Sequence, residues 1–487
     1  MTFPWDETAD VAVVGFGAAG VAAALCAADA GARVLVLEKQ AAHAHTPSAK
    51  AAGGYVMGVH DVEAASTYLH ACAGGLTPAS VCRAWAEQAG SLHDWLLSEA
   101  GELSWSEPTT MHGRAAHPNL PGAASVWTRL YQVPGGGPRH GAELFAALSD
   151  ALSRRSTAAI RWRHAGRRLL KDSAGRVVGV EVDTPEGVRR IRARSGVILT
   201  TGGFEFDEDL KRQYLKAAPM HFAGNPANTG DGLRMALAAG ADLWHMNGAA
   251  GRQTGHFPYG DGWLNFQMAI NPPGYVVLDR YGNRFCDEQR YTEIHTLWYE
   301  MLAFDAERRE YSRIPSYWVF DTRRFAAGPL TPAGIGRIAL GHYDWSPDNG
   351  KELAQGWITS GDTVEEAVAA AGVLDPSAAA ASVAAFNDGC ALGEDPFGRA
   401  APSLVPLDCP PYYCVPLYPG GVSTMGGPRH DEYGRVLDPF GGPIPGLFSA
   451  GTVGQMIGML YPSAGAGWSE ALCAGRLAGT SAAAHPA

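Results

Sequence analysis

Short apolar runs that end in glycine or an acidic residue recur along this chain and predict the strands of a parallel sheet. The first run, Val11–Val14, leads into glycines, and Val34–Leu37 follows after an alanine-rich stretch long enough for one helix. Continuous apolar residues, rather than alternating ones, are typical of strands buried on both faces. Residues 196–202 and 445–451 repeat the pattern. We therefore expect all four runs to join one sheet.

Helical spacing and a change in composition predict the remaining organisation. Apolar residues recur at helical intervals between 80 and 100, which favours helices whose tryptophans are core residues. A small-residue loop precedes a helix at 233–239, and a last helix is expected near 467–478. Aromatic residues and turn signals increase between 272 and 408, and no glycine turn of the nucleotide type occurs there. We expect these residues to form a domain inserted between 1–271 and 409–487.

Composition and charge exclude several classes of protein. The net charge of −11 and the lack of a basic run disfavour nucleic acid and anionic membranes as partners. No run is long and apolar enough to span a membrane, and residues 1–10 lack the features of a leader peptide, so we expect a soluble, cytoplasmic protein. The eight cysteines form no Cys-x-x-Cys pair, which disfavours a disulfide scaffold or a thiol redox centre.

Three glycines follow the first strand in Gly-x-Gly-x-x-Gly spacing: Gly15, Gly17 and Gly20. The first permits a tight turn, the second lets the backbone approach a pyrophosphate, and the third lets helix and strand pack closely. The N–H groups at the start of the helix, at Ala18 and Ala19, then face the phosphates. Glu38 ends the second strand, where an acid accepts hydrogen bonds from ribose hydroxyls. These features predict an α/β, Rossmann-like domain, and the motif by itself fits FAD or NAD.

Seven short motifs occur in order along the chain: Gly15–Gly20, Ala52–Gly54, Thr201–Phe204, Asn228–Gly232, Gly282–Phe285 with Glu288, Thr424–Gly427 and Gly446–Gly451. Together they resemble the flavoprotein superfamily of fumarate reductases, succinate dehydrogenases and 3-ketosteroid dehydrogenases. The resemblance spans nearly the whole chain. It implies FAD, a Rossmann-like domain that binds the ADP half of this cofactor, and an α+β substrate-cap domain that closes over the isoalloxazine ring.

The same resemblance implies which residues bind the cofactor: Gly15, Gly17, Ala18, Ala19, Gly20, Glu38, Lys39, Ser48, Gly53, Gly54, Thr201, Gly202, Asn228, Asp231, Gly451, Thr452 and Ala466. In succinate dehydrogenases and fumarate reductases a histidine links covalently to the flavin, but the matching position is Pro47. Non-covalent FAD is therefore expected. His43 and His45 lack a third ligand at a suitable spacing, so we expect surface histidines and no metal.

The segment after Gly451 departs from the fumarate reductases. Those enzymes carry a His-Gly-x-Asn-Arg segment that helps to hold a dicarboxylate, whereas residues 452–467 contain neither His nor Arg. Its apolar residues suit a hydrophobic substrate, because burial of a dicarboxylate without cations is costly. Tyr461-Pro before a glycine-rich turn is similar to the 3-ketosteroid dehydrogenases. Ser463 is similar to the Δ4-(5α) type and unlike the Δ1 type, which tends to have glycine there.

Desaturation next to a ketone needs three chemical groups. The resemblance implies that the Tyr461 hydroxyl and a backbone N–H near Gly465 bind the ketone oxygen and stabilise an enolate. Flavin N5 accepts the β-hydride. A base must remove the α-proton, and the candidates, which the sequence does not rank, are Ser463, Tyr291, Tyr317 and Tyr343. Arg429 and Met425 are candidates for substrate binding, with Arg429 suited to the carboxylate of a keto acid.

The sequence therefore predicts an FAD-dependent dehydrogenase that introduces a C=C bond α,β to the ketone of an apolar cyclic substrate. That substrate is a 3-ketosteroid or a smaller alicyclic ketone or keto acid, and the electron acceptor stays open. An enoate reductase of the fumarate or urocanate kind is the enzymatic alternative. A non-catalytic flavoprotein or electron-transfer subunit is the alternative from another class.

Overall fold

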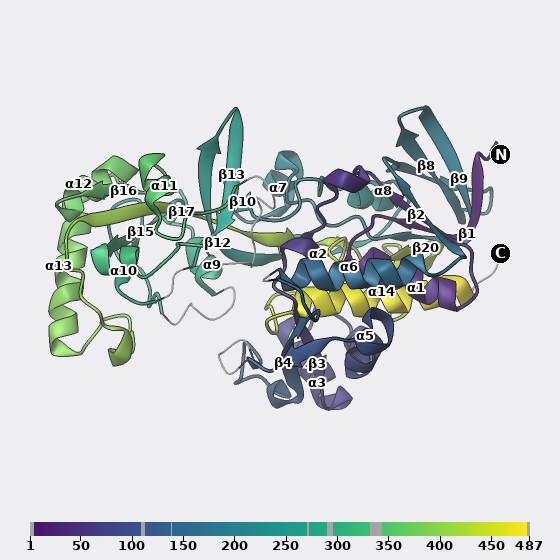
Figure 1. Cartoon of the computed structure of the whole chain (residues 1–487), viewed down its shortest axis with the longest axis horizontal. Helices are drawn as coiled ribbons and strands as arrows, with labels where there is room; N and C mark the ends of the chain where they lie inside the picture. The colour runs from purple at the N-terminus through teal and green to yellow at the C-terminus, as the bar shows by residue number, and fades with distance from the viewer. Residues whose placement is uncertain are drawn as a thin grey trace. The chain divides into compact units, whose positions relative to one another are not determined.

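The computed structural model describes residues 4–108, 113–137, 139–269, 272–289, 296–331 and 343–484, which form two compact units (Figure 1). The first unit comprises Met1–Leu215, Asn225–Ala250 and Ser423–Ala487, and the second comprises Lys216–Gly224 and Gly251–Val422. The second unit thus extends beyond the inserted domain expected at 272–408. The extra residues belong to it because they supply strands of its own sheet.

The main sheet of the first unit runs in the order β19 (Arg435–Leu437), β20 (Pro443–Ser449), β9 (Gly187–Leu199), β1 (Glu7–Val14), β2 (Val34–Glu38) and β6 (Ala158–Trp162). β7 (Ala165–Lys171) and β8 (Val177–Thr184) extend it beside β9. β1 is parallel to β2 and β9, and β20 is parallel to β9. The four apolar runs therefore lie in one sheet, as their pattern predicted.

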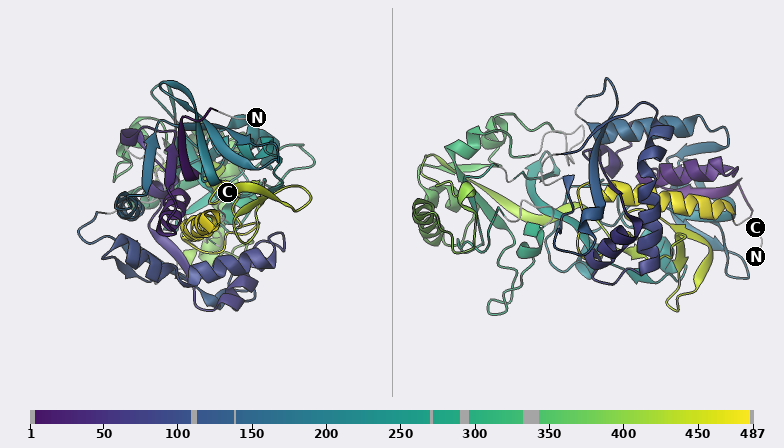
Figure 2. Two further views of the ribbon diagram at one scale, coloured as in Figure 1. Left: turned by 90° about the vertical axis from the view of Figure 1, so that its right-hand side faces the viewer. Right: turned by 90° about the horizontal axis from the view of Figure 1, so that it is seen from below.

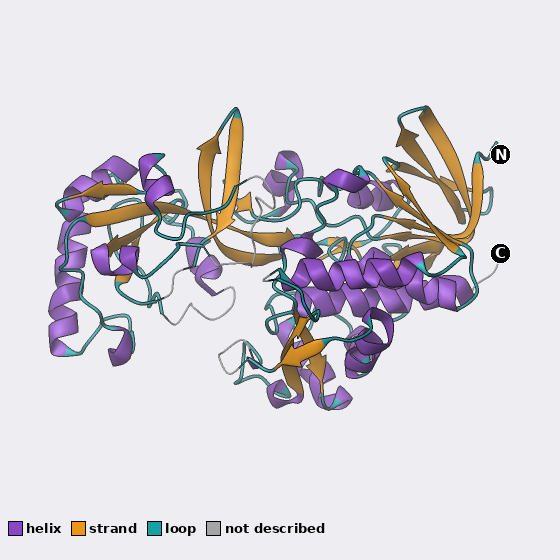
Figure 3. Cartoon of the chain, in the orientation of Figure 1, coloured by secondary structure: helices purple, strands orange, loops and turns teal. Residues whose placement is uncertain are grey.

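Both faces of this sheet are buried. Val11 and Val13 of β1 pack into one core with helices α1 (Ala18–Asp29), α6 (His140–Ser153) and α14 (Ala466–Ala484). Ala12 and Val14 point the other way, into a core shared with β7–β9 and α8 (Asp231–Ala238). This arrangement explains why the run Val11–Val14 is apolar at every position. Figure 3 shows the helices as purple ribbons against the orange strands.

Helices α1 and α14 lie side by side, as both views in Figure 2 show. Two glycines of α14 make the close approach possible. A Cβ at Gly475 would lie 2.5 Å from the Ala19 carbonyl oxygen, and one at Gly479 would lie 2.3 Å from that of Ala23. The last helix of the chain is therefore packed against the helix of the first βαβ unit.

The first unit also contains two small sheets and further helices: α2 (Ser48–Ala51), β3 (Tyr55–Val59), α3 (Val62–Cys72), α4 (Ala79–Gly90), α5 (Leu92–Ala100), β4 (Ser104–Ser106), β5 (Val126–Gln132), α7 (Glu208–Tyr214), β11 (Leu243–Trp244) and β18 (Gly427–Pro428). The helices expected between 80 and 100 are α4 and α5, and Trp85 is a core residue, as predicted. Strand β3 pairs with β5, and β5 pairs with β4.

The second unit is built around one sheet: β13 (Gly262–Gln267), β12 (Ala249–Tyr259), β17 (Tyr412–Thr424), β15 (Ser316–Asp321) and β14 (Tyr275–Leu278), with β10 (His221–Phe222) and β16 (Thr359–Gly361) on β17. Its helices are α9 (Thr296–Met301), α10 (Thr322–Ala326), α11 (Gly350–Ala354), α12 (Val364–Ala371) and α13 (Pro376–Leu392). Trp318, Trp345 and Trp357 are buried in its core, so they pack rather than line a surface. None of the helices in the described ranges is long and apolar enough to cross a membrane.

Candidate functional site

The loop between β1 and α1 has the geometry of a phosphate-binding turn. Gly15 has φ of +105°, which other residues rarely adopt, and a Cβ there would lie 2.5 Å from the Thr200 carbonyl oxygen. A Cβ at Gly20 would lie 2.1 Å from the Gly15 carbonyl oxygen, so only glycine allows helix and strand to approach so closely. A Cβ at Gly17 would have nothing within 4 Å. The backbone at Gly17 thus faces open space, beside the N–H groups of Ala18 and Ala19.

Glu38 connects this loop to the end of β2. Its Oε2 accepts a hydrogen bond from the Phe16 N–H at 2.8 Å, and its Oε1 accepts one from the Gln40 N–H at 2.8 Å. A carboxylate has about four acceptor positions, so two bonds leave capacity for ribose hydroxyls. His45 is buried and stacks on Phe16 at 5.5 Å between ring centroids. The expectation of a surface histidine is wrong for His45, because aromatic packing buries it, and burial lowers its pKa to about 4.

Lys39 connects β2 to the loop before α8. Its Nζ donates to Asp231 Oδ2 at 2.6 Å and to Thr229 Oγ1 at 2.9 Å. Asn228 lies on the same loop, and its side chain packs against the loop that follows β9, where a Cβ at Gly202 would lie 2.5 Å from Asn228 Oδ1. The structure therefore brings together four of the residues that the resemblance assigned to the cofactor.

Two buried hydroxyls support the assignment of a ligand to this region. Ser48 Oγ and Thr201 Oγ1 are inaccessible to solvent and have no hydrogen-bond partner among the described residues. Buried polar groups are normally paired, so oxygens without partners point to a group that binds there. Both residues were assigned to the cofactor from the sequence. The donors and acceptors present thus fit a polar dinucleotide such as FAD.

Motifs from the end of the chain approach the first glycine loop. Gly451 follows β20 with φ of +79°, and a Cβ there would lie 2.8 Å from the Ala19 Cβ. Thr452 is half-buried beside it, and Ala466 is buried at the start of α14. Gly53 and Gly54 are buried just before β3, and Gly54 also has a positive φ of +77°.

Tyr461 lies against the start of α14. The Gly467 N–H donates a hydrogen bond to the Tyr461 hydroxyl oxygen at 2.6 Å. Gly465 has φ of +78°, and a Cβ there would lie 2.5 Å from the Tyr55 carbonyl carbon. Glycine is therefore required at 465 for two reasons, and the turn places the phenol oxygen at a helix N-terminus. Tyr461 and the Gly465 turn thus both lie at the start of α14.

Ser463 is held by structural hydrogen bonds. Its side chain is fully buried, and its hydroxyl lies 2.8 Å from Thr128 Oγ1 and donates to the Arg114 carbonyl oxygen at 3.0 Å. Thr128 also donates to the Ala464 carbonyl oxygen at 3.0 Å. Ser463 therefore attaches β5 and the segment at 113–117 to the turn that carries Tyr461.

Sequence reasoning missed the segment at 113–117. Its Ala116 N–H donates to the Pro462 carbonyl oxygen at 2.8 Å, and the Tyr68 hydroxyl donates to the same oxygen at 2.6 Å. The imidazole of His117 hydrogen-bonds the Tyr461 backbone, which partly offsets the lowering of its pKa by burial. No motif marks these residues, because more than three hundred positions separate them from Tyr461 in the sequence.

The tyrosines expected from the cap have other surroundings. The Tyr317 hydroxyl donates to the Gly372 carbonyl oxygen at 3.0 Å, and burial raises its pKa to about 12. The Tyr343 hydroxyl donates to Glu352 Oε1 at 2.6 Å, and its pKa is also raised, chiefly by burial. Both side chains are buried in the cores of the second unit. Tyr291 lies outside the described residues.

The two candidates for substrate binding differ in exposure. Met425 is buried, and its N–H donates to the Gly248 carbonyl oxygen at 3.0 Å. Arg429 is half-exposed, and its guanidinium lies 3.3 Å from Asp242 Oδ2. This ion pair reduces the attraction of Arg429 for a second carboxylate.

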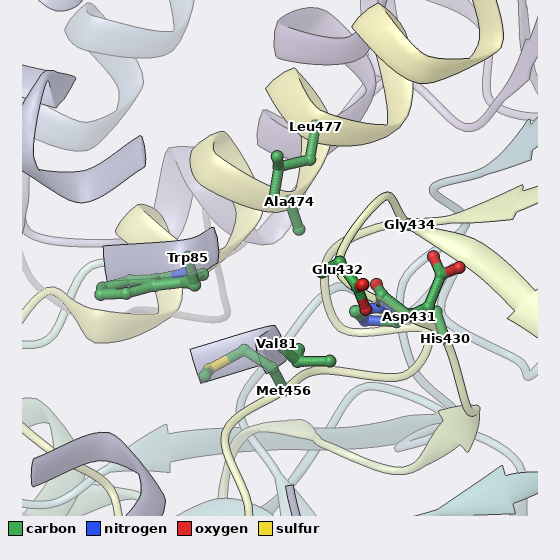
Figure 4. A pocket seen from close by; sticks show the side chains of 9 residues that line it. All are labelled: Val81, Trp85, His430, Asp431, Glu432, Gly434, Met456, Ala474 and Leu477. Atoms are coloured by element: carbon green, nitrogen blue, oxygen red, sulfur yellow. Dashed lines mark hydrogen bonds between the residues drawn. The ribbon is translucent and has the colours of Figure 1, made fainter. Parts of the chain in front are cut away.

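A narrow pocket lies elsewhere in the first unit, between α4, α14 and the turn after β18 (Figure 4). Val81, Trp85, Met456 and Ala474 form its apolar side. His430, Asp431 and Glu432 lie opposite them. Met456 belongs to the apolar segment that the sequence linked to a hydrophobic substrate, and His430 follows the candidate Arg429.

A family model described as an FAD binding domain matches residues 10–468, which is nearly the whole chain. The chain belongs to this FAD-binding family. FAD is therefore its cofactor, and the glycine loops and buried hydroxyls described above fit it. The family is one of oxidoreductases, and its members with named activities include the relatives that follow.

Two curated relatives act on cyclic ketones, according to their names. The 4-oxocyclohex-2-ene-1-carboxylate 5-dehydrogenase of Sinomonas cyclohexanicum is 30% identical over 337 residues, which cover 64% of this chain and 54% of the relative. The chain thus spans about half the length of that protein. The 3-oxosteroid 1-dehydrogenase of Mycobacterium tuberculosis is 28% identical over 570 aligned positions, which cover 96% of this chain and 97% of the relative.

Solved structures show the same fold. The 3-ketosteroid Δ1-dehydrogenase of Sterolibacterium denitrificans, in complex with 1,4-androstadiene-3,17-dione, has a TM-score of 0.84 at 25% identity and covers 98% of this chain and 100% of its own. A flavocytochrome c3 fumarate reductase has a TM-score of 0.73 at 25% identity and covers 99% of this chain and 79% of its own. The 3-ketosteroid-Δ4-(5α)-dehydrogenase of Rhodococcus jostii RHA1 has a TM-score of 0.70 and covers 99% of this chain and 98% of its own. Because its identity is 24%, it supports the fold alone. The backbone is thus more similar to the Δ1 enzyme, although Ser463 resembles the Δ4-(5α) type.

Proposed function

We propose that this protein is an FAD-dependent dehydrogenase that desaturates a cyclic ketone next to its carbonyl group. The observation that carries the proposal is the hydrogen bond from the Gly467 N–H to the Tyr461 hydroxyl oxygen at 2.6 Å. A hydroxyl that accepts such a bond becomes a stronger donor, because hydrogen bonds in a chain polarise one another. Tyr461 is therefore suited to donate to a ketone oxygen on which negative charge develops.

In the proposed reaction, the residues at the start of α14 bind and polarise the ketone. Tyr461 and a backbone N–H of the Gly465 turn form the oxyanion hole for the ketone. The positive end of the α14 dipole lies at the same place and favours negative charge there. FAD supplies the hydride acceptor when it is bound. Non-covalent binding of FAD is part of the proposal, since Pro47 occupies the position of the histidine anchor.

We propose structural roles for three of the four candidates for the base. Ser463, Tyr317 and Tyr343 each donate their hydroxyl proton to an acceptor within the protein. A tyrosine with a pKa of about 12, as burial gives Tyr317, is a poor base at neutral pH. Tyr291 stays a prediction from the sequence.

The substrate class in the proposal is a cyclic ketone, either a 3-ketosteroid or a smaller alicyclic ketone or keto acid. The activities for which the relatives are named support a ring and a ketone, and they do not distinguish a steroid from a smaller ring. A dicarboxylate reductase is disfavoured because residues 452–467 carry no His or Arg. A non-catalytic flavoprotein does not require a hydroxyl held at a helix N-terminus.

Anaerobic titration of the FAD-loaded protein tests the proposal. 5α-Androstane-3,17-dione, which is saturated on both sides of its 3-ketone, 4-oxocyclohexanecarboxylate and succinate are added in turn, and flavin absorbance is followed. Bleaching by either ketone supports the proposal and identifies the size class. Bleaching by succinate alone supports the dicarboxylate alternative, and no bleaching by any of the three contradicts the ketone assignment for these substrates.

A further inference from the structure

Glu205 is a fully buried carboxyl group that no motif singled out. It follows the glycine loop after β9, and its side chain reaches two other loops of the first unit. The first is the loop that carries Asn228, and the second begins at Thr424, the last residue of β17. All three segments lie in or beside motifs that carry the family resemblance, and Gly202 and Asn228 are among the residues assigned to the cofactor.

Each oxygen of Glu205 accepts hydrogen bonds from a different loop. Asn228 Nδ2 donates to Oε1 at 2.7 Å. Thr424 donates to Oε2 twice, from Oγ1 at 3.2 Å and from its N–H at 3.4 Å. Thr424 Oγ1 in turn accepts from the Phe204 N–H at 2.9 Å, so its own proton is directed to Glu205.

The donors around Glu205 favour an acceptor at each of its two oxygens. The groups around Glu205 are donors on both sides, and a carboxylate accepts at both oxygens. A glutamine offers one carbonyl oxygen and places an NH₂ group against a donor. Burial raises the pKa of Glu205 to about 7, and the bonds from Asn228 and Thr424 oppose that rise. Burial outweighs these bonds in the balance, and the donors from Asn228 and Thr424 keep the pKa from rising further.

The space around Glu205 is closed by glycines. A Cβ at Gly203 would lie 2.2 Å from Thr424 Oγ1 and 2.4 Å from Glu205 Oε2. A Cβ at Gly202 would lie 2.5 Å from Asn228 Oδ1. The three loops therefore interlock around one carboxylate. A buried carboxyl group without an ion pair is costly, and such a group is commonly retained for function.

We propose that Glu205 is a positioning residue for FAD. It orients the Asn228 amide and the Thr424 loop, so that the groups assigned to the cofactor are in place before FAD binds. The inference rests on the cofactor role of Asn228 and does not depend on which substrate the enzyme oxidises. Binding of FAD to the apoprotein therefore tests it separately from the ketone chemistry.

The test compares Glu205→Gln and Glu205→Asp with the wild type, using apoprotein titrated with FAD and quenching of flavin fluorescence. Glu181→Gln is the matched control, because Glu181 is also buried in the first unit but interacts with arginines of β7 and β9. Loss of a charge-assisted bond is worth about 1.5–3 kcal/mol, so the Kd for FAD should rise about 10–100-fold in Glu205→Gln. Glu205→Asp should recover part of this loss, and the control should stay within about twofold.

A double-mutant cycle with Asn228→Ala separates positioning from general stability. If Glu205 acts through Asn228, the two substitutions together raise the Kd for FAD little more than either one does alone. The midpoint of thermal unfolding of the apoprotein should change less in Glu205→Gln than that of the FAD-bound form. Thr424→Val supplies the same comparison if Glu205→Gln does not fold. A Kd for FAD within twofold of wild type, or additive effects in the cycle, overturns the proposal.

Discussion

The Gly467 N–H and the Tyr461 hydroxyl oxygen lie 2.6 Å apart, so a phenol receives a hydrogen bond from the first turn of α14. A Cβ at Gly467 would lie 2.9 Å from this oxygen, which shows how closely the ring approaches the helix. The turn at Gly465 makes the approach possible because its φ is +78°. This contact joins the loop between β20 and α14 to the first turn of α14, the helix that packs on α1.

The first prediction concerns the hydroxyl of Tyr461. Tyr461→Phe removes one donor with little change of shape, and loss of one oxyanion-hole donor typically slows the reaction about 10²–10³-fold. Flavin reduction by the best ketone should fall by this factor, measured by anaerobic stopped flow, while the FAD content is unchanged. Turnover close to that of the wild type would remove Tyr461 from the mechanism.

The second prediction concerns attachment of the cofactor. Purified protein should be yellow, and acid precipitation should release all of the flavin as FAD, because Pro47 replaces the histidine anchor. The measurement is the flavin spectrum of pellet and supernatant. Flavin that stays in the denatured pellet would show a covalent link at another residue.

The third prediction separates structure from catalysis at Ser463. Ser463→Ala and Thr128→Val each remove part of one buried hydrogen-bond network. Each should lower the free energy of unfolding by about 1–3 kcal/mol, the usual cost when a buried polar group loses its partner. If the role is structural, flavin reduction at saturating ketone should fall less than tenfold in both. A loss of 10²-fold or more in Ser463→Ala alone, strongest at neutral pH, would instead identify it as part of the proton path.

The fourth prediction concerns Glu470, a fully buried residue of α14 whose Oε1 accepts from the Met456 N–H at 3.4 Å. Burial raises its pKa from 4.5 to about 8. The folded protein therefore holds a proton that the unfolded chain releases above pH 4.5. The stability linked to this group is fully present below pH 4.5 and is lost as the pH rises towards 8, at about 1.4 kcal/mol per pH unit.

Glu470→Gln should remove that part of the pH dependence. Urea unfolding of wild type and variant between pH 5 and pH 9 measures it, and the difference in their free energies of unfolding should change with pH. Parallel pH profiles for the two proteins would show that Glu470 is ionised in the folded state across this range.

The sequence by itself determined the parts of this protein that depend on local backbone chemistry. Gly15 and Gly20 predict the turn and the close packing of the first βαβ unit, because no other residue tolerates the conformation or the contact. The apolar run Val11–Val14 predicts a strand buried on both faces, and its side chains do alternate between two cores. The order of the motifs was enough to identify FAD, which the family match bears out.

Only the tertiary structure decided what side chains do when their partners are distant in the sequence. The sequence shows a serine at 463 but not whether it acts as a base or holds segments together. Its hydrogen bonds to Thr128 and Arg114 form only when β5 and the 113–117 segment fold against it. Glu205 carries no local signal, because its donors come from the loop before α8 and from the last residue of β17. Hydrogen bonds and burial depend on where side chains lie in space. Patterns in the sequence predict only the contacts between residues that are close along the chain.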